Sequence, residues 1–270
     1  FNPEDMYADD DMVITISHLG YIKRTPLADF RSQARGGIGS KASSSRDEDF
    51  IEYVHQASMH STMMFFTEMG RLYWLKVYEI PEGNKQSKGR AIQNMINLQK
   101  GDKVRAFINV KGLNDQEYVE KHYLIFATKN GLMKKTTLEA YSHPRANGII
   151  ALGLREGDQL IGVTLTDGES EMLIASHNGK VVRFNESTVR PMGRNASGVR
   201  AIKLDEDGVD SAVGMICVEK GSNKTVLVIS EKGFGKRTVL DDENGEPIYR
   251  VTNRGGKGVK TMNLTDKTAN

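Results

Sequence analysis

The sequence of 270 residues has one cysteine, six prolines and no long apolar run. A single cysteine excludes an internal disulfide framework and a zinc site built from several cysteines, and it is typical of a reducing cytoplasm. No stretch approaches the roughly 18 consecutive apolar residues of a membrane-spanning helix, so we expect no membrane partner. The first residues lack an initiator methionine and a signal-peptide pattern, and we expect a longer protein to precede them.

The sequence also lacks an excess of charge, because it has 37 Lys and Arg and 35 Asp and Glu. Aromatic residues make up only 7% of the chain. Such a mild balance does not by itself indicate a nucleic-acid partner, so the positions of the cations decide the question. Few aromatics argue against stacking of unpaired bases. Neither a recognition helix nor a zinc finger is evident, which argues against sequence-specific base reading.

Catalytic motifs are absent as well. The six histidines show no metal-ligand spacing and share no repeat position, which argues against a metal site. The glycine-rich segment 36–41 lacks the Gly-Lys-Ser/Thr order of a phosphate-binding loop. Carboxylates gather in turns, where solvation is their usual role, and no tyrosine has the context of a DNA-cleavage residue. We therefore predict no catalytic residue, no metal and no cofactor in this chain.

What the sequence does contain is a repeat. Five segments share an apolar strand, a Ser or Thr, two variable residues and a glycine, and these glycines are Gly20, Gly70, Gly131, Gly179 and Gly233. A second glycine follows in each unit, at Gly39, Gly89, Gly148, Gly198 and Gly258. Units of about fifty residues with four strands are typical of propellers. We predict a single all-β domain over 1–270, a propeller-like pinwheel of about five four-stranded blades. Its repeats are approximately 10–60, 61–118, 119–168, 169–220 and 221–270.

Local features refine this prediction. We expect each first glycine to close a hairpin, with Asn130-Gly131 and Asn178-Gly179 at the two central positions of type I′ turns, where φ is positive. The longest insertion, 111–121, is polar and predicts a loop. The fifth unit ends before its last strand, so we expect the final blade to be incomplete and a sixth blade to be missing from this chain.

Cations recur in phase with the repeats. Four places after the first glycine stand Arg24, Lys135, Arg183 and Arg237, with Trp74 as the exception, and Lys23, Lys134 and Lys236 precede three of these. Four places before the second glycine stand Arg35, Lys85, Arg194 and Arg254, and Arg145 lies beside the exception Pro144. Equivalent positions of stacked repeats lie on one surface, so we predict a cationic stripe on the outer rim. Such a stripe suits the phosphates of duplex DNA. We expect the loop glycines to let backbone N–H groups approach phosphates, and Tyr73 and Trp74 to be packing residues.

A motif in the first repeat resembles the motif of a known family. The segment Gln33-Ala34-Arg35-Gly36-Gly37-Ile38-Gly39 resembles the box motif of the C-terminal, DNA-wrapping domain of bacterial DNA gyrase A, Gln-basic-Arg-Gly-Gly-basic-Gly, at five of seven positions. The fifth repeat carries the related segment Arg254-Gly255-Gly256-Lys257-Gly258. Segments 189–200 and 233–238 are also similar to this family, and the resemblance covers nearly the whole chain.

The resemblance implies a domain that wraps double-stranded DNA around its rim, which allows gyrase to introduce negative supercoils in the bacterial cytoplasm. It also implies partners, namely the rest of the gyrase A protein and the gyrase B protein, with ATP and Mg used elsewhere in the holoenzyme. Family members commonly have six repeats. The predicted DNA-binding residues are Lys23, Arg24, Gln33, Arg35, Gly36, Gly37, Gly39, Lys41, Lys85, Lys134, Lys135, Arg145, Arg183, Arg194, Arg200, Lys236, Arg237, Arg254 and Lys257.

Two alternatives remain open at this point. The equivalent C-terminal domain of topoisomerase IV shares the fold and lacks the box, whose flanking cations are replaced here by Ala34 and Ile38. A protein-binding propeller scaffold uses repeats of similar length, but it predicts an apolar or mixed rim rather than a cationic one.

Overall fold

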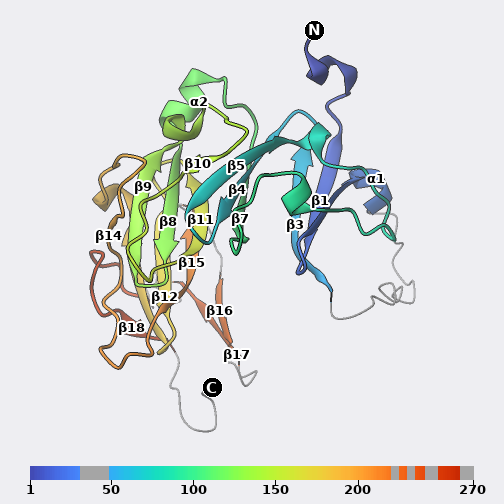
Figure 1. The fold of residues 1–270 in the computed structure, drawn as a ribbon. Helices are drawn as coiled ribbons and strands as arrows, with labels where there is room; N and C mark the ends of the chain where they lie inside the picture. Colours follow the sequence, from blue (N-terminus) through green and yellow to red (C-terminus); the bar gives the residue numbers. More distant parts are fainter. Residues whose placement is uncertain (31–48, 220–224, 230–234, 241–248, 262–270) are drawn as a thin grey trace.

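The regular structure of the chain is almost entirely β-strand. The computed structural model describes residues 1–30, 49–219, 225–229, 235–240 and 249–261. These residues form four antiparallel sheets of four strands and one sheet of two strands (Figure 1). The prediction of an all-β, propeller-like pinwheel is confirmed. Among the described residues, no helix is long and apolar enough to cross a membrane.

The first two sheets, or blades, come from the N-terminal part of the chain. The first blade has the order β3-β1-β2-β6, with β1 (Asp11–Ser17), β2 (Tyr21–Pro26), β3 (Ile51–Ser58) and β6 (Arg90–Ala91). The second blade has the order β10-β5-β4-β7, with β4 (Thr62–Thr67), β5 (Arg71–Lys76), β7 (Val104–Val110) and β10 (Ile149–Ile150).

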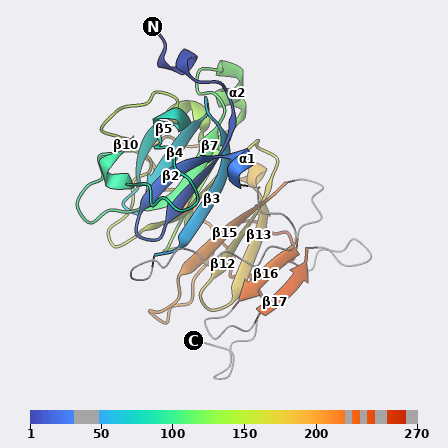
Figure 2. The same ribbon diagram turned by 90° about the vertical axis from the view of Figure 1, so that its right-hand side faces the viewer.

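The remaining blades repeat this arrangement. The third has the order β11-β8-β9-β14, with β8 (Tyr123–Thr128), β9 (Leu132–Thr137), β11 (Leu160–Thr166) and β14 (Val199–Arg200). The fourth has the order β15-β12-β13-β18, with β12 (Glu171–Ser176), β13 (Lys180–Asn185), β15 (Ala212–Val218) and β18 (Val259–Lys260). Beside the fourth blade, β16 (Thr225–Ile229) pairs with β17 (Gly235–Val239) (Figure 2).

Each four-stranded blade takes its last strand from the following repeat. For example, β6 follows Gly89 in the second repeat but pairs with β2 of the first blade. The strands β10, β14 and β18 are exchanged in the same way. The expectation that one repeat supplies all four strands of a blade is therefore wrong. We call the segments that carry the exchanged strands straps, and the described ones are 77–91, 138–150, 186–200 and 249–260 of the second to fifth repeats.

The exchanged strands lie at the outside of the array. Strand β11 contacts both β7 and β15, so the opposite edge strands of neighbouring blades meet at the centre. The exchanged strands occupy the other edge of each sheet. We call the exposed outer surface of the straps the rim.

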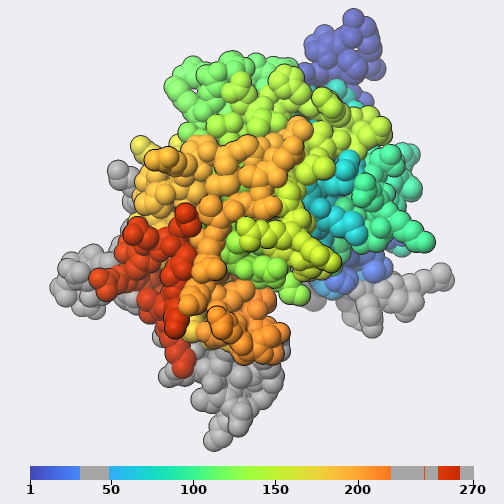
Figure 3. Space-filling model, turned by 60° about the vertical axis from the view of Figure 1, so that its left-hand side comes forward, coloured from blue at the N-terminus to red at the C-terminus, as the bar shows by residue number. Residues whose placement is uncertain are grey.

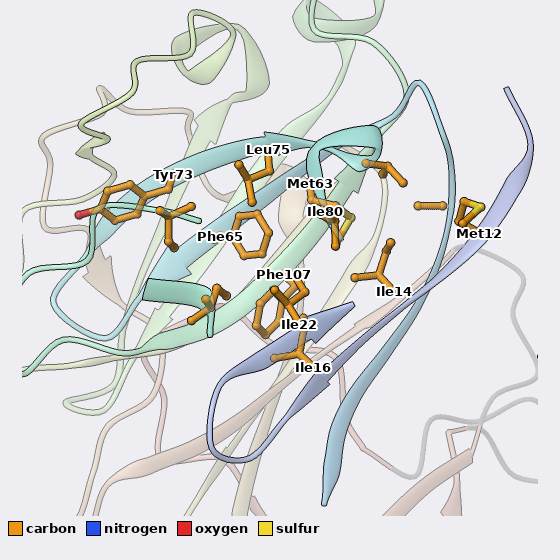
Figure 4. Close-up of a cluster of buried hydrophobic side chains, with 14 of the residues drawn as sticks. Met12, Ile14, Ile16, Ile22, Met63, Phe65, Tyr73, Leu75, Ile80 and Phe107 are labelled. Carbon is orange, nitrogen blue, oxygen red and sulfur yellow. The ribbon is translucent and has the colours of Figure 1, made fainter. Parts of the chain in front are cut away.

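The hydrophobic core lies between successive blades rather than within one. On β4, Met63 and Phe65 pack toward the first blade, while Met64 and Phe66 pack toward the third. Side chains alternate between the two faces of a strand, so a strand buried on both faces has a continuous apolar sequence. The same alternation on β8 and β12 explains the apolar runs that mark the repeats. Figure 4 shows the cluster between the first two blades.

The few helical segments are short, and one of them corrects the sequence prediction. Besides α1 (Leu27–Phe30) and short 3-10 turns, the structure has α2 (Gln116–Lys121) within the insertion that was expected to be a loop. The Asp115 side chain accepts a hydrogen bond from the Tyr118 N–H and caps this helix. Val119 is buried under it, so the insertion covers the core between the second and third blades.

The hairpin turns explain why Ser or Thr always stands three places before the first glycine. In the fourth blade, the Gly179 N–H donates to the Ser176 carbonyl at 3.1 Å, and the Lys180 N–H donates to the Ser176 Oγ at 3.2 Å. Glycine is thus the fourth residue of the turn, and the prediction of Asn178 and Gly179 as the central pair of a type I′ turn is wrong. The glycine still has a positive φ, of 81°. The other three four-stranded blades have the same two hydrogen bonds.

An aspartate in the following turn closes the hairpin of each four-stranded blade. Asp102, Asp158 and Asp210 each accept a hydrogen bond from the residue before the hairpin glycine, and Asp49 does the same in the first blade. The acidic turns therefore have a structural role that solvation alone does not describe.

Candidate nucleic-acid interface

In the four four-stranded blades, the position four places after the hairpin glycine carries a donor that reaches the next repeat. Arg24 donates from Nη1 to the Ile80 carbonyl at 2.9 Å, and Trp74 donates from Nε1 to the Tyr141 carbonyl at 3.1 Å. Lys135 donates to the Glu186 carbonyl at 3.2 Å, and Arg183 donates to the Leu240 carbonyl at 3.3 Å. In every described case the acceptor lies after the second strand of the following repeat. The shared property of the row is thus an N–H donor rather than a charge.

This donor row corrects the predicted stripe. Arg24, Lys135 and Arg183 are only 4–7% exposed, so their side chains form no rim surface. A buried carbonyl without a donor is costly, and each of these side chains supplies a donor from the preceding repeat. The Glu186 carbonyl also accepts a hydrogen bond from the Val189 N–H at 3.0 Å. Trp74, the apparent exception, donates the equivalent hydrogen bond from its indole N–H. Arg24, Lys135 and Arg183 join neighbouring blades, and we do not assign these three cations to DNA.

Trp74→Phe tests this role, because it removes the indole N–H and keeps an aromatic ring. We expect a loss of about 1 kcal/mol in the free energy of unfolding, since the Tyr141 carbonyl loses its side-chain donor. Urea denaturation would measure the change. An unchanged midpoint would contradict a bonding role for the row.

Two of the buried cations are also neutralised. The Lys135 ammonium lies 3.2 Å from the Glu186 carboxylate, and both side chains are almost fully buried. Glu186 also accepts from the Thr166 hydroxyl and the Ser170 N–H. The Arg183 Nε lies 2.6 Å from the Glu171 carboxylate. Their charges are therefore balanced inside the protein.

The lysines one place earlier hold the strap loops. The Lys23 ammonium donates to the carbonyls of Asn84, Lys85 and Ser87. Burial lowers the pKa of Lys23 below its usual value. The prediction that Lys23 lies on the rim is wrong, because its side chain runs under the strap of the second repeat.

Lys134 has the same role in the third blade. It donates to the Tyr141 hydroxyl at 2.9 Å, to the Ala151 carbonyl at 2.5 Å and to the Arg194 carbonyl. Burial, with a smaller contribution from the Arg194 charge, lowers the pKa of Lys134 to about 7. Its side chain is fully buried, so Lys134 also lies beneath the rim rather than on it.

The second glycines have a structural reason as well. A Cβ at Gly89 would lie 2.4 Å from the Ile22 carbonyl oxygen, and one at Gly198 would lie 2.1 Å from the Met133 carbonyl oxygen. Both glycines have positive φ. The expectation that these glycines open the backbone to phosphates is wrong for the described straps, because each glycine faces the preceding blade.

Nine exposed cations lie on the straps, and others, such as Lys100, Lys103 and Lys111, lie in turns elsewhere. Of the predicted residues, Lys85, Arg145, Arg200 and Lys257 are exposed, and Arg194 and Arg254 are half-buried. The straps add five exposed cations that the repeat phase did not identify, namely Lys88, Arg90, Arg190, Arg250 and Lys260. Their only signal in the sequence is their place between the second strand and the end of the exchanged strand.

Hydrogen bonds at or just after the ends of the straps join the third, fourth and fifth straps into one surface. The Gly255 N–H donates to the Ala201 carbonyl at 2.7 Å, and the Lys203 N–H donates to the Gly256 carbonyl at 2.8 Å. Gly153 and Ala196 form a similar bond between the ends of the third and fourth straps. Figure 3 shows the orange and red segments of the fourth and fifth repeats side by side on this face.

Some predicted residues have no described environment. Gln33, Arg35, Gly36, Gly37, Gly39 and Lys41 lie outside the described residues. Lys236 and Arg237 lie on β17, whose side chains are not described. The box motif and these two cations stay predictions. Within the described part of the chain, no three acidic, histidine or cysteine side chains gather as metal ligands.

A comparison with family models identifies the family. The model for the DNA gyrase C-terminal domain, described as a beta-propeller, matches residues 11–58, 61–111, 122–167, 170–219 and 224–267. The matched segments cover most of the chain.

Curated proteins and solved structures give similar matches. The chain is 43% identical to the DNA gyrase A protein of Staphylococcus epidermidis over 267 residues, which are 99% of this chain and 29% of that protein. The DNA gyrase A protein of Staphylococcus aureus is 42% identical over the same shares. The solved C-terminal domain of DNA topoisomerase IV has a TM-score of 0.74 and 25% identity, over 94% of this chain and 73% of that one. A solved DNA gyrase A C-terminal domain has a TM-score of 0.71 and 24% identity, over 96% of this chain and 80% of that one.

Proposed function

The chain belongs to the family of DNA gyrase C-terminal domains, and from that premise we propose that it binds duplex DNA along the rim and bends it. The observation that carries the proposal is the set of exposed cations on the straps, of which the third to fifth are joined by hydrogen bonds. Cations that neutralise phosphates release condensed counterions, which gives binding without base reading.

The charges of the straps favour a polyanion. In the described residues, the second strap has three cations and two carboxylates, and the third has one of each. The fourth strap has three cations and one carboxylate, which is the buried Glu186, and the fifth has four cations and none. The second and fourth straps and the described part of the fifth thus carry more cations than carboxylates, although Asp241, Asp242, Glu243 and Glu246 precede that part in the sequence. A cationic rim favours duplex DNA over the apolar or mixed rim of a protein-binding scaffold.

The wider activity belongs to a longer protein. The chain spans 29% of the length of the curated relatives that it matches. We propose that the bent DNA is used by a gyrase that introduces negative supercoils in the bacterial cytoplasm, with the rest of the gyrase A protein and the gyrase B protein as partners. DNA cleavage and ATP hydrolysis, with Mg, are assigned to those parts, and no cofactor or catalytic residue to this domain.

Neutralising rim cations tests DNA binding. The triple substitution of Arg190, Arg200 and Lys260 by Gln removes three exposed charges. We expect the slope of log K against log salt to fall by about 2.7, since each phosphate contact contributes roughly 0.9. Affinity should fall for all duplex sequences alike, and a mobility-shift titration at several salt concentrations would measure both effects.

A matched control carries the same charge change away from the rim. Lys100, Lys103 and Lys111 are also exposed, but they lie in turns before and after β7. Their triple replacement by Gln should leave the slope nearly unchanged. Equal losses in both triples would contradict a DNA path along the rim, and a loss confined to one DNA sequence would indicate base reading.

Topoisomerase IV is the second candidate, because the solved domain of that enzyme is structurally similar at a TM-score of 0.74. The sequence relatives at 42–43% identity are gyrases, which favours the gyrase role. Sealing nicked circles in the presence of the chain separates the two. A large change in linking number supports wrapping, and binding without such a change supports the topoisomerase IV role.

A further inference from the structure

The cationic rim has one interruption in the described residues, and it lies at the third strap. Of the four exchanged strands, β6, β14 and β18 each carry an exposed cation, namely Arg90, Arg200 and Lys260. Strand β10 instead consists of Ile149, which is buried, and Ile150, which is 50% exposed.

Ile150 occupies the same structural position as two of these cations. Ile150 pairs with Arg71, Arg200 pairs with Leu132 and Lys260 pairs with Lys180, and each partner is the residue after a hairpin glycine. Because register fixes the face on which a side chain points, a cation at 150 would join the row formed by Arg200 and Lys260. An exposed isoleucine at that position leaves an apolar spot on the rim.

The neighbours of Ile150 do not fill this interruption. Arg71 lies opposite and keeps its positive charge, but its guanidinium donates to the Tyr73 hydroxyl and to the Asn147 carbonyl, which holds it against the strap. Arg145 is the only other cation of this strap, and the strap also carries Glu139. The third strap is thus neutral by formal charge, between a second strap of +1 and a fourth of +2, as given by their cations less their carboxylates.

We propose that the third strap is a neutral gap in the DNA path, set by Ile150, so that the duplex is held in two arms on either side of it. This inference rests on the proposed function. One arm contacts the second strap, and the other contacts the fourth and fifth straps. Duplex DNA is stiff over the distance of one blade, so it can pass an uncontacted strap without leaving the rim.

Ile150→Lys is the direct test, because it adds the missing charge at an exposed site. We expect the salt slope to steepen by about 0.9, the value of one phosphate contact, and the affinity to rise several-fold. Hydroxyl-radical footprints should show an unprotected interval between two protected arms with the wild type, and protection across that interval with the variant. The unfolding midpoint should not change.

Two controls separate the effect of a charge at position 150 from the effect of added net charge and from the effect of removing the isoleucine. Val54→Lys adds the same charge at a residue that is 53% exposed on β3, the strand at the opposite edge of the first blade. Neither Val54→Lys nor Ile150→Gln should steepen the slope. An equal gain with Val54→Lys would overturn the proposal, because net charge would then explain the effect.

The remaining outcomes are also decisive. An unchanged slope with Ile150→Lys, or a marked loss of affinity with Ile150→Gln, would overturn the gap, because the path would avoid residue 150 or already contact it. If the wild type itself shows no salt-dependent binding of duplex DNA, the proposed function fails. If the wild type binds and only the Ile150→Lys result is negative, the gap alone is wrong.

Discussion

Gly198→Ala is expected to destabilise the domain by about 3 kcal/mol. The φ of Gly198 is +99°, and a Cβ would lie 2.1 Å from the Met133 carbonyl oxygen. A left-handed backbone costs an L-residue roughly 1–2 kcal/mol, and forced overlap in a packed site typically costs a further 1–3 kcal/mol. The third and fourth repeats are joined at this contact, so the loss should appear in urea denaturation as a lower midpoint.

Gly157→Ala is the matched control for backbone strain. Gly157 also has a positive φ, of +77°, but no heavy atom lies within 4 Å of its ideal Cβ. Only the backbone term applies, and we expect a loss of about 1 kcal/mol. If both variants lose the same free energy, the close approach of the strap to the preceding blade contributes nothing.

The free energy of unfolding is expected to rise with pH between about 7 and 10. The pKa of Lys134 is lowered to about 7 by burial, whereas an unfolded lysine titrates near 10.4. In this window the unfolded chain binds more protons than the native one, so stability increases with pH. The rise has an upper limit of about 1.4 kcal/mol per pH unit, or about 4 kcal/mol over the window.

Above about pH 10 the trend should reverse. Burial raises the pKa of Tyr141, so the native state keeps a proton that unfolded tyrosine releases near pH 10. Urea titrations from pH 6 to 11 would show a maximum near pH 10. Lys134→Met should remove most of the rise, because it has no proton to lose. A wild-type stability that is flat from pH 7 to 10 would mean that the three oxygens around Lys134 keep its ammonium charged.

The sequence predicted the repeat and its hairpins because both are local. An apolar run buried on two faces and a glycine of positive φ depend on neighbouring residues, and both recur in each unit. The exchange of strands could not be predicted in this way. A periodic sequence has the same pattern whether a segment such as 199–200 pairs within its own repeat or with the preceding blade.

The prediction that the cations after the hairpin glycine lie on the rim was wrong for a related reason. A position in phase with the repeat has the same environment in each blade, but that environment can be the interior as easily as the surface. Trp74 was the informative residue, because its indole has an N–H donor, as Lys and Arg do, but carries no charge. Among the strap cations, Lys85, Arg194 and Arg254 recur four places before the second glycine and were identified by that phase. Most of the others vary in position from blade to blade, and the box at 33–39 lies outside the described residues.

The exchanged strands also affect how the domain is made on the ribosome. A newly synthesised blade lacks its outer strand until most of the strap of the next repeat has emerged. The hairpin glycines are 48–61 residues apart, and translation proceeds at roughly 5–20 residues per second. Each blade therefore waits several seconds with an open sheet edge, to which the strands of another nascent chain could pair. Rare codons placed within a strap should lengthen this interval and increase aggregation, whereas the same codons after the strap should not.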